Sequence, residues 1–328
     1  MDYFKILPEE ITLDILTRLP VESVLESKLF VGSFNGLICL LTHAENQPFW
    51  ICNPITREYV TLPKIKRDCF HTDEYGCWMF GFGYVSSTSE YKVVVIYVSK
   101  TETHVEVRIY TIGSGNGWKK LGKFNYGWSP YNSLGIYVSG ALYWVDRKVE
   151  MIIIFNLAEE KFAEHLLPPP LVQDRRYRTI GWVLNGFLSF VVFVAADRYS
   201  RFYDIWLLKN KNENHDMKEG EEHQSFVWSK KFRIDDSQLL AVTKGDGVFT
   251  YSSNYLSIYD RKTSTSKKLV KFTNAIEVYP HQNTLVSLKQ LGEEDTKIME
   301  SFETAETNNH DYPLKKLQED VNPEYIYL

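Results

Sequence analysis

Cysteine, clustered positive charge and long apolar segments are all scarce in this chain of 328 residues. Its four cysteines are too few to cross-link a chain of this length, which excludes a disulfide scaffold. Lysine and arginine total 37 against 42 acidic residues, a formal charge of −5 at pH 7. Because nucleic-acid binding depends on clustered positive charge, this balance argues against nucleic acid as the main ligand.

Signals for export or membrane insertion are also missing. The sequence does not open with a signal-peptide pattern, and it contains no Asn-x-Ser/Thr glycosylation acceptor. Its longest apolar run, residues 180–196, is short for a helical span and is interrupted by Asn185-Gly186, a dipeptide typical of a hairpin turn. We therefore expect a protein without a membrane span, located in the cytoplasm, the nucleus or both.

The common catalytic motifs are absent as well. The sequence has no P-loop, HExxH zinc motif, nucleophile elbow or dinucleotide fingerprint. Cys69, His71 and Cys77 would supply three zinc ligands, but no CxxC pair fixes their geometry and no fourth ligand lies nearby. The glycine-rich residues 113–117 lie between two expected strands, so they favour a hairpin turn over a phosphate cradle, which needs a following helix. We expect no catalysis, no bound metal and no cofactor.

The chain does have an amphipathic leader, residues 7–29, which predicts two short helices. Pro8 suits the first turn of a helix, and two glutamates follow it at the positive end of the helix dipole. Apolar residues recur at helical spacing up to Leu19, and Pro20 ends the first helix and begins the second. Such an apolar face packs either on the rest of the chain or on another protein.

Beyond residue 30 the sequence repeats a pattern of strands. A turn glycine leads into an apolar, aromatic strand at four places: Gly36, Gly140, Gly186 and Gly247. The first interval holds two units of about 52 residues, with a matching hairpin at residues 91–112, and the last is lengthened by a polar insertion at residues 209–224. A period of about 46–52 residues is typical of the four-stranded blades of a β-propeller, with a β-sandwich as the alternative.

Both parts of the sequence resemble one known family. The leader, which reads Leu-Pro-x-x-Ile-x-x-x-Ile-Leu-x-x-Leu-Pro-Val from residue 7, resembles the first half of a plant F-box. The segments GSFNGLIC from residue 32, WICNPIT from residue 50 and FGY from residue 82 resemble the F-box-associated domain, a kelch-like β-propeller of plant F-box proteins. This second resemblance spans about residues 31–291.

The resemblance implies the fold and its divisions. We expect a mainly β protein, an irregular β-propeller at residues 31–291 preceded by a short helical F-box remnant at residues 1–30. Residues 292–328 are acidic and polar, a composition that predicts a disordered tail. The third F-box helix does not follow residue 29, so the F-box is predicted to be truncated after its first half. The sequence leaves open whether this truncated F-box binds the adaptor normally or more weakly.

The family's function implies two binding surfaces and no catalytic residue. The chain is expected to be the substrate-recognition subunit of a Skp–cullin–F-box ubiquitin ligase. Its leader would bind the Skp adaptor and, through it, the cullin–RING ligase, while the β-domain would bind a target protein for ubiquitination. The positions that match the adaptor-docking pattern are Leu7, Pro8, Ile11, Ile15, Leu16, Leu19, Pro20, Val21 and Leu25.

Two features of the β-domain are candidates for target binding. Arg175, Arg176 and Arg178 form the densest basic cluster, which suits bidentate contacts to an acidic or phosphorylated segment; a solvated loop between blades is the alternative. Trp118, Trp128 and Tyr131 would act as aromatic anchors at the mouth of the propeller, or else pack in the core.

Two other functions fit the same residues. A propeller that binds a target without ligase activity would compete with intact relatives, and binding to a purified Skp adaptor would distinguish it. An enzyme in the propeller channel, such as a kelch-type oxidase, would need clustered metal ligands, for which the sequence offers only the group around Cys69.

Overall fold

The structure is a computed structural model. It describes residues 28–42, 48–65, 77–99, 104–125, 127, 133–170, 178–184, 186–195, 201–210, 226–235, 238–242, 247–252, 255–260, 263, 265–271 and 281–299. All the regular structure in these ranges is β-strand. The described residues contain no helix long and apolar enough to span a membrane. The helices predicted for the leader lie outside the described residues as far as residue 27. Residues 28–30, which the prediction assigned to the helical part, instead begin strand β1.

Twenty strands form five antiparallel blades of four. Blade 1 contains β1 (Lys28–Phe34), β2 (Leu37–Thr42), β3 (Phe49–Asn53) and β4 (Glu58–Thr61). Blade 2 contains β5 (Cys77–Val85), β6 (Glu90–Val98), β7 (His104–Thr111) and β8 (Lys119–Asn125). Blade 3 contains β9 (Ile136–Val138), β10 (Ala141–Val145), β11 (Ile152–Asn156) and β12 (Lys161–Phe162). Blade 4 contains β13 (Arg178–Leu184), β14 (Phe187–Ala195), β15 (Arg201–Asn210) and β16 (Phe226–Asp235). Blade 5 contains β17 (Gln238–Val242), β18 (Gly247–Ser252), β19 (Tyr255–Asp260) and β20 (Thr265–Lys271).

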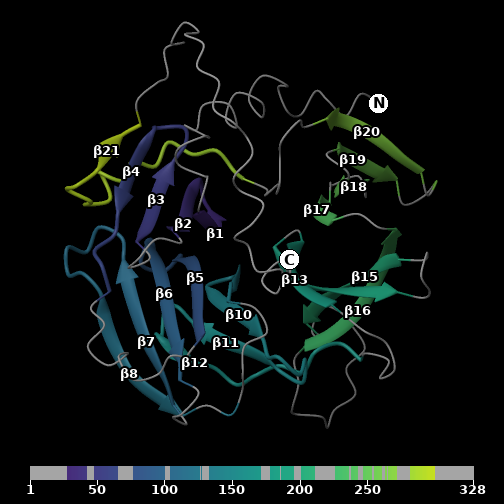
Figure 1. The fold of residues 1–328 in the computed structure, drawn as a ribbon, viewed down its shortest axis with the longest axis horizontal. Helices are drawn as coiled ribbons and strands as arrows, with labels where there is room; N and C mark the ends of the chain where they lie inside the picture. Colours follow the sequence, from purple (N-terminus) through teal and green to yellow (C-terminus); the bar gives the residue numbers. More distant parts are fainter. Residues whose placement is uncertain are drawn as a thin grey trace, which may run out of the picture.

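The blades are arranged around a common centre, with the first strand of each blade innermost (Figure 1). Strands β1, β5, β9, β13 and β17 contact one another in that order. This arrangement is a β-propeller of five blades and confirms the predicted fold class over the β-sandwich alternative. The sequence alone did not indicate the number of blades.

The repeated glycine marks the hairpin between the first and second strands of a blade. Gly36 and Gly140 have φ angles of 80° and 85°, and Asn35 and Ser139 before them are also positive at 46°. A two-residue hairpin turn of type I′ requires positive φ at both positions, which glycine and asparagine tolerate best. Blade 2 makes this turn without glycine, which explains the doubled interval in the sequence.

A second repeated feature ends the third strand of a blade. Asn53 and Asn156 each accept a hydrogen bond at 2.9 Å from the backbone N–H two residues further on, and Asp260 accepts one at 3.3 Å from three residues further on. These side chains fix the turn into the outer strand, as asparagine and aspartate commonly do. The polar turns of the sequence pattern therefore serve the same purpose in blades 1, 3 and 5.

Apolar clusters fill the space between blades 1 and 2, 2 and 3, 3 and 4, and 4 and 5. Between blades 1 and 2, for example, the rings of Phe49 and Phe80 meet edge to face with centroids 5.6 Å apart. Each large apolar side chain buried in this way contributes about 1.5–3 kcal/mol. The largest fully buried side chains are Trp144, Phe49, Phe82, Phe155 and Phe190.

Residues 281–299, which we call the strap, wrap around the outer edge of blade 1. Strand β21 (Lys297–Ile298) pairs antiparallel with β4 and is the fifth strand of that sheet (Figure 1, yellow). Leu288 is fully buried between blades 1 and 2, whereas Met299 is buried in a cluster on the other face of blade 1. The domain end predicted at residue 291 falls within the strap.

Candidate protein-binding site

The residues predicted to bind adaptor or target lie almost entirely outside the described residues. This holds for the nine leader positions and for Arg175, Arg176 and Trp128. Arg178 is the first residue of β13, the inner strand of blade 4. These assignments therefore stay predictions, and the described residues supply independent candidates.

The predicted metal ligands are not brought together in the described residues. Cys77 begins β5, while Cys69 and His71 lie outside the described ranges. No group of three or more His, Cys, Asp or Glu side chains within those ranges is placed to hold a metal ion. Cys39 and Cys52 are buried on neighbouring strands, but their register directs them to opposite faces of blade 1. Burial raises the pKa of the Cys39 thiol, which keeps it protonated and unreactive.

The glycine-rich residues 113–117 connect β7 to β8, as the predicted hairpin turn requires. Trp118, which follows this turn, packs on Phe49 and Tyr110 with ring centroids 5.6 and 5.5 Å apart. Its indole N–H donates to the Pro63 carbonyl oxygen at 2.6 Å. Trp118 is therefore part of the packing between blades 1 and 2, not an exposed anchor.

Blade 1 binds the strap through two polar side chains that flank the turn between β3 and β4. The Asn53 amide donates to the Val286 carbonyl at 2.6 Å and to the Thr284 carbonyl at 3.2 Å. The Glu58 carboxylate accepts from the Ser287 hydroxyl and from the backbone N–H of the next residue, both at 2.7 Å. These bonds satisfy polar groups of residues 284–288, which belong to no strand.

Blade 2 holds the strap through Glu293, which is 7% exposed. Its carboxylate accepts from the Gly113 N–H at 2.7 Å and from the Tyr110 hydroxyl at 3.2 Å. Burial, followed by the charge of Glu293, raises the pKa of Tyr110 to about 12, because both disfavour a phenolate. The strap thus joins blade 1 to blade 2.

Ser33 and His281 form a pair at the start of the strap. The Ser33 hydroxyl lies 2.9 Å from Nδ1 of His281, whose Nε2 has no hydrogen-bond partner among the described residues. Burial lowers the pKa of His281, so the imidazole is neutral near pH 7. Without an acidic group on Nε2, these two residues lack the third member of a nucleophilic triad.

Blades 2 and 3 share a buried ion pair at the same end of the propeller. The Lys92 ammonium donates to Glu160 at 2.8 Å and to the Leu157 carbonyl at 3.2 Å, and Lys119 donates to the other Glu160 oxygen at 2.6 Å. Burial acts to raise the pKa of Glu160, but hydrogen bonds from Lys119 and Lys92 outweigh it and the pKa is lowered. These bonds fix the seam between the two blades.

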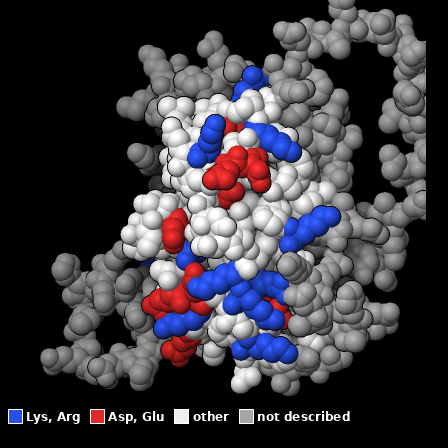
Figure 2. Space-filling model, turned by 90° about the vertical axis from the view of Figure 1, so that its left-hand side faces the viewer, with Lys and Arg blue, Asp and Glu red and all other residues white. Residues whose placement is uncertain are grey.

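Charges on the outer surface of blades 1 and 2 are interspersed (Figure 2). On β8, for example, Lys120 lies 3.1 Å from the Glu106 carboxylate of β7, which Arg108 also contacts at 2.8 Å. Burial acts to raise the pKa of Glu106, yet the hydrogen bonds from these two cations lower it. This side of the propeller therefore presents paired charges rather than a patch of one sign.

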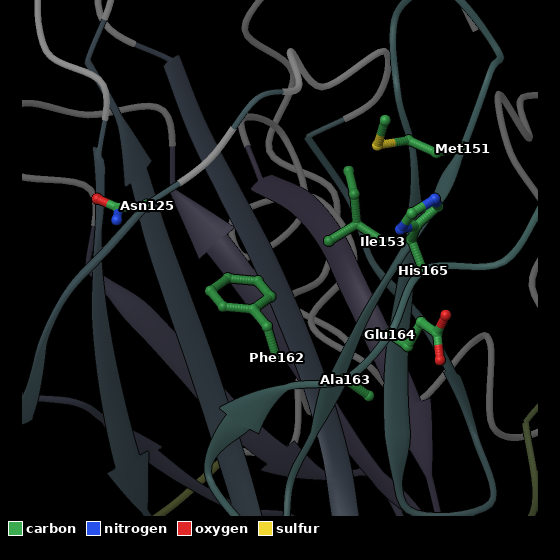
Figure 3. Close-up of a pocket in the computed structure, with 7 residues that line it drawn as sticks. All are labelled: Asn125, Met151, Ile153, Phe162, Ala163, Glu164 and His165. Carbon is green, nitrogen blue, oxygen red and sulfur yellow. The ribbon is translucent and has the colours of Figure 1, made fainter.

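A small pocket of about 210 Å³ opens between blades 2 and 3. It is lined by Asn125, Met151, Ile153, Phe162, Ala163, Glu164 and His165. In the view of Figure 3, the Phe162 ring lies between Asn125 and the Ile153 side chain. Pockets for small molecules usually measure about 300–1,000 Å³, so this one is smaller than a usual small-molecule site.

The clearest candidate for protein binding is a set of exposed apolar side chains at one end of blade 4, which we call the apolar end of blade 4. The register directs Val183 and Phe226 to one face of this sheet and Phe187 and Val227 to the other. The strand register places the first residues of β14 and β16 beside the ends of β13 and β15. The Trp228 N–H donates to the Leu167 carbonyl at 2.8 Å, which brings the end of blade 3 against this edge. Its members, with their exposed fractions, are Leu167 (56%), Val183 (36%), Phe187 (43%), Phe226 (45%) and Val227 (44%).

The sequence carries a signal for these exposed apolar residues. Phe187 directly follows the hairpin glycine of blade 4, and Phe226 and Val227 directly follow the polar insertion. Large apolar residues beside turns are exposed more often than those in the middle of strands, because the sheet covers fewer of their sides. Gathered exposed apolar residues commonly mark protein-interaction surfaces.

The fold defines this chain as a member of the class of five-bladed β-propellers. Residues 8–283 match the family described as the F-box associated beta propeller domain. The match covers most of the chain, and the chain therefore belongs to this family. This confirms the resemblance found in the sequence.

Curated relatives from the plant Arabidopsis thaliana agree with the family. F-box protein At3g07870 is 25% identical over 284 residues, which cover 73% of this chain and 65% of that protein. F-box protein At4g22390 is 30% identical over 230 residues, which cover 62% of this chain and 52% of that protein. F-box/kelch-repeat protein At3g23880 is 26% identical over 190 residues, with coverages of 56% and 49%. The chain thus spans about half to two thirds of the length of these relatives.

Solved structures share a more distant likeness. An exo-β-1,3-galactanase from Phanerochaete chrysosporium with galactose has a TM-score of 0.40 at 8% identity, covering 74% of this chain and 66% of that one. The β-propeller domain of the Trilobed protease from Pyrococcus furiosus has a TM-score of 0.37 at 12% identity, covering 75% and 84%. Likenesses of this level carry no information on function.

Proposed function

We propose that this chain is the target-recognition subunit of a Skp–cullin–F-box ubiquitin ligase and performs no catalytic step itself. One observation carries the proposal: the family match begins at residue 8, inside the leader, and continues through the propeller to residue 283. The match to the F-box associated beta propeller domain thus takes in most of the leader as well as the propeller, and relatives such as F-box protein At3g07870 are named as F-box proteins. The proposal also places the chain in the cytoplasm, the nucleus or both.

In this role the two parts of the chain bind different proteins. The apolar face of the leader docks on the Skp adaptor, which connects to the cullin–RING ligase. The apolar end of blade 4 binds the target, because exposed aromatic and aliphatic side chains such as Phe187 and Phe226 are typical anchors of protein interfaces. Holding both proteins on one chain raises the effective concentration of the target lysines near the charged ubiquitin-conjugating enzyme.

Co-precipitation of the full chain with a purified plant Skp adaptor tests this function. Leu16→Asp and Leu19→Asp should each abolish binding, because each substitution buries a charge in the docking face. Thr17→Asp is the matched control, since it adds the same charge on the opposite side of the predicted helix. If both leucine variants still bind, the leader is not the contact; if the unaltered chain does not bind at micromolar concentration, the ligase role is wrong.

A second candidate is a target-binding propeller without ligase activity, which would compete with intact relatives. The observation that favours it is the start of β1 at Lys28, which leaves no room for a third F-box helix between leader and propeller. Reconstituted ubiquitin transfer separates the two functions. A recognition subunit promotes transfer to its bound target, whereas a competing module lowers the transfer catalysed by a relative with a complete F-box.

A further inference from the structure

The outer strand of blade 5 carries three exposed lysines and is the edge of its sheet among the described residues. In β20, Lys267, Lys268 and Lys271 follow one another closely. The register pairs Lys271 with Tyr255 and Lys268 with Ser257, with an irregularity between the two pairs. Because residues 255 and 257 share one face of β19, this bulge places Lys268 and Lys271 on the same face of the blade.

Both of these lysines lie over one aromatic ring. The ammonium of Lys268 is 4.1 Å from the centroid of the Tyr255 ring, and that of Lys271 is 5.8 Å away. The negative face of the ring attracts each ammonium and holds it in position. Two like charges near one ring also repel each other, so an anion between them gains from both.

The outer strands of three other blades also carry cations, and five of these have carboxylate partners: Lys119, Lys120, Lys161, Lys230 and Arg233. Lys119 pairs with Glu160 at 2.6 Å, and Lys161 pairs with Glu159 at 2.8 Å. On β16, Lys230 and Arg233 both contact the Asp204 carboxylate at 2.7 Å. Within the part of the chain that the structure describes, the three β20 lysines form no such pair. Blade 5 therefore presents unneutralised positive charge where its neighbours do not.

The chain itself demonstrates what such an edge can bind. In blade 1, β21 adds to the outer strand β4 as a fifth antiparallel strand. Lysines on an exposed edge repel the same edge of a second copy, which protects against self-association. The same lysines attract an extended segment of opposite charge, whose backbone can complete the sheet.

We infer that the outer edge of blade 5 binds an extended acidic segment of the target protein. The segment pairs with β20 through its backbone, and its carboxylates contact Lys268 and Lys271 on one face and Lys267 on the other. The inference rests on the proposed function for the identity of the partner as a ligase target. Binding at this edge does not require the adaptor, so the two proposals fail in different experiments.

Fluorescence anisotropy with the full chain tests the edge. The probe is a fluorescein-labelled peptide of about ten residues in which glutamate alternates with valine, long enough for one strand. We expect binding that weakens as salt is added and that falls about tenfold or more when Lys268→Gln and Lys271→Gln are combined. A peptide with glutamine in place of glutamate should bind at least about tenfold more weakly.

The matched control combines Lys119→Gln with Lys161→Gln, which removes the same charge from edges whose lysines already have partners. The inference is overturned if this control variant loses as much affinity for the probe as the Lys268 and Lys271 variant. It is also overturned if the glutamine peptide binds as tightly as the glutamate peptide. An acidic peptide with proline at alternate positions lacks every second backbone N–H donor and cannot form a regular ladder in the middle of a sheet, so equal binding of that peptide overturns the strand geometry. All variants replace exposed side chains, and an unchanged circular dichroism spectrum verifies their folding.

The chain's own residues 301–328 are the rival occupant, since they contain six acidic residues and two lysines. If the probe binds only after these residues are removed, the edge belongs to the tail and the partner inference is wrong. If adaptor binding fails while the probe still binds β20, the ligase role fails and the edge stands. If the adaptor binds and the probe does not, the ligase role stands and the inference about the β20 edge is wrong.

Discussion

Gly113 lies directly against the backbone carbonyl of Leu291, so closely that a β-carbon on Gly113 would overlap it. Gly113 also has a φ angle of 77°, a conformation that side chains of L-residues rarely adopt. The residue belongs to the turn of blade 2, while Leu291 belongs to the strap. A turn that the sequence pattern marks only as glycine-rich is therefore a contact point between segments far apart in the chain.

Gly113→Ala is expected to destabilise the fold by about 3 kcal/mol or more, because the strap carbonyl has to move in addition to the backbone strain. Gly115→Ala is the matched control. Gly115 also has positive φ, at 68°, but a β-carbon there meets no atom within 4 Å, so only the conformational term of about 1–2 kcal/mol applies. Urea unfolding monitored by tryptophan fluorescence measures both; equal losses would show that the strap contact contributes nothing.

The strap's buried side chains give a second prediction. Leu288 has no exposed surface, so Leu288→Ala should reduce the free energy of unfolding by about 2–5 kcal/mol through lost burial and a cavity. Leu285 in the same segment is 81% exposed, and Leu285→Ala should change stability by less than about 0.5 kcal/mol. Similar effects of the two substitutions in thermal unfolding would mean that the strap is not packed on the propeller.

The raised pKa of Tyr110 predicts that the folded protein loses stability at alkaline pH. This pKa is raised from 10 to about 12, mainly by burial and then by Glu293. A raised pKa in the folded state gives a contribution that is complete below the unfolded value of 10 and is lost as the pH rises through about 12. Tyr110→Phe should remove this part of the alkaline decline in unfolding free energy. An unchanged pH profile in that variant would assign the decline to other groups.

Glu160 is expected to contribute more to stability than Lys119, the exposed lysine with which it pairs. Glu160→Gln leaves the Lys92 ammonium buried beside a neutral amide, which should reduce stability by about 2–4 kcal/mol. Lys119→Gln removes a side chain that is 64% exposed and should reduce it by less than about 1 kcal/mol. Because the pKa of Glu160 is lowered in the folded protein, its contribution to the free energy of unfolding is present above the ordinary glutamate pKa and is lost on acidification. The free energy of unfolding of Glu160→Gln should therefore fall less steeply as the pH is lowered. Equal effects of the two substitutions would contradict the burial of the pair.

Thiol labelling provides a test that needs no variant. Cys39 has no exposed surface and a raised thiol pKa, whereas Cys77 is partly exposed. Iodoacetamide followed by peptide mass spectrometry should modify Cys77 in the folded protein and Cys39 only after unfolding. Modification of Cys39 at the rate of Cys77 would contradict its place between blades 1 and 2.

The sequence predicted the blades well because each unit carries local signals. Asn35-Gly36 and Ser139-Gly140 encode hairpins through their own backbone preferences, and Asn53 encodes the next turn through its side chain. These signals act within a few residues, so they are legible without any knowledge of the rest of the fold.

The strap was not predicted, for a physical reason. Residues 292–299 contain mainly charged and polar residues, and the composition of such a segment favours disorder. The strap as a whole is held by long-range hydrogen bonds: Asn53 and Glu58 bind residues 284–288, and Gly113 binds Glu293, each more than 170 positions away. No local pattern records a bond of that kind. The same holds for the β20 lysines, whose lack of carboxylate partners depends on neighbouring strands.

The strap also sets the order in which the protein can be completed. The ribosome makes blade 1 first, yet the outer edge of β4 receives β21 only after residues 297–298 have been synthesised. Until then the edge strand Glu58–Thr61, which unlike the outer strands of the other four blades contains no lysine or arginine, is open to other chains. Nascent and C-terminally shortened chains therefore leave this edge unpaired by β21, and the earliest blade to form is the last to be protected.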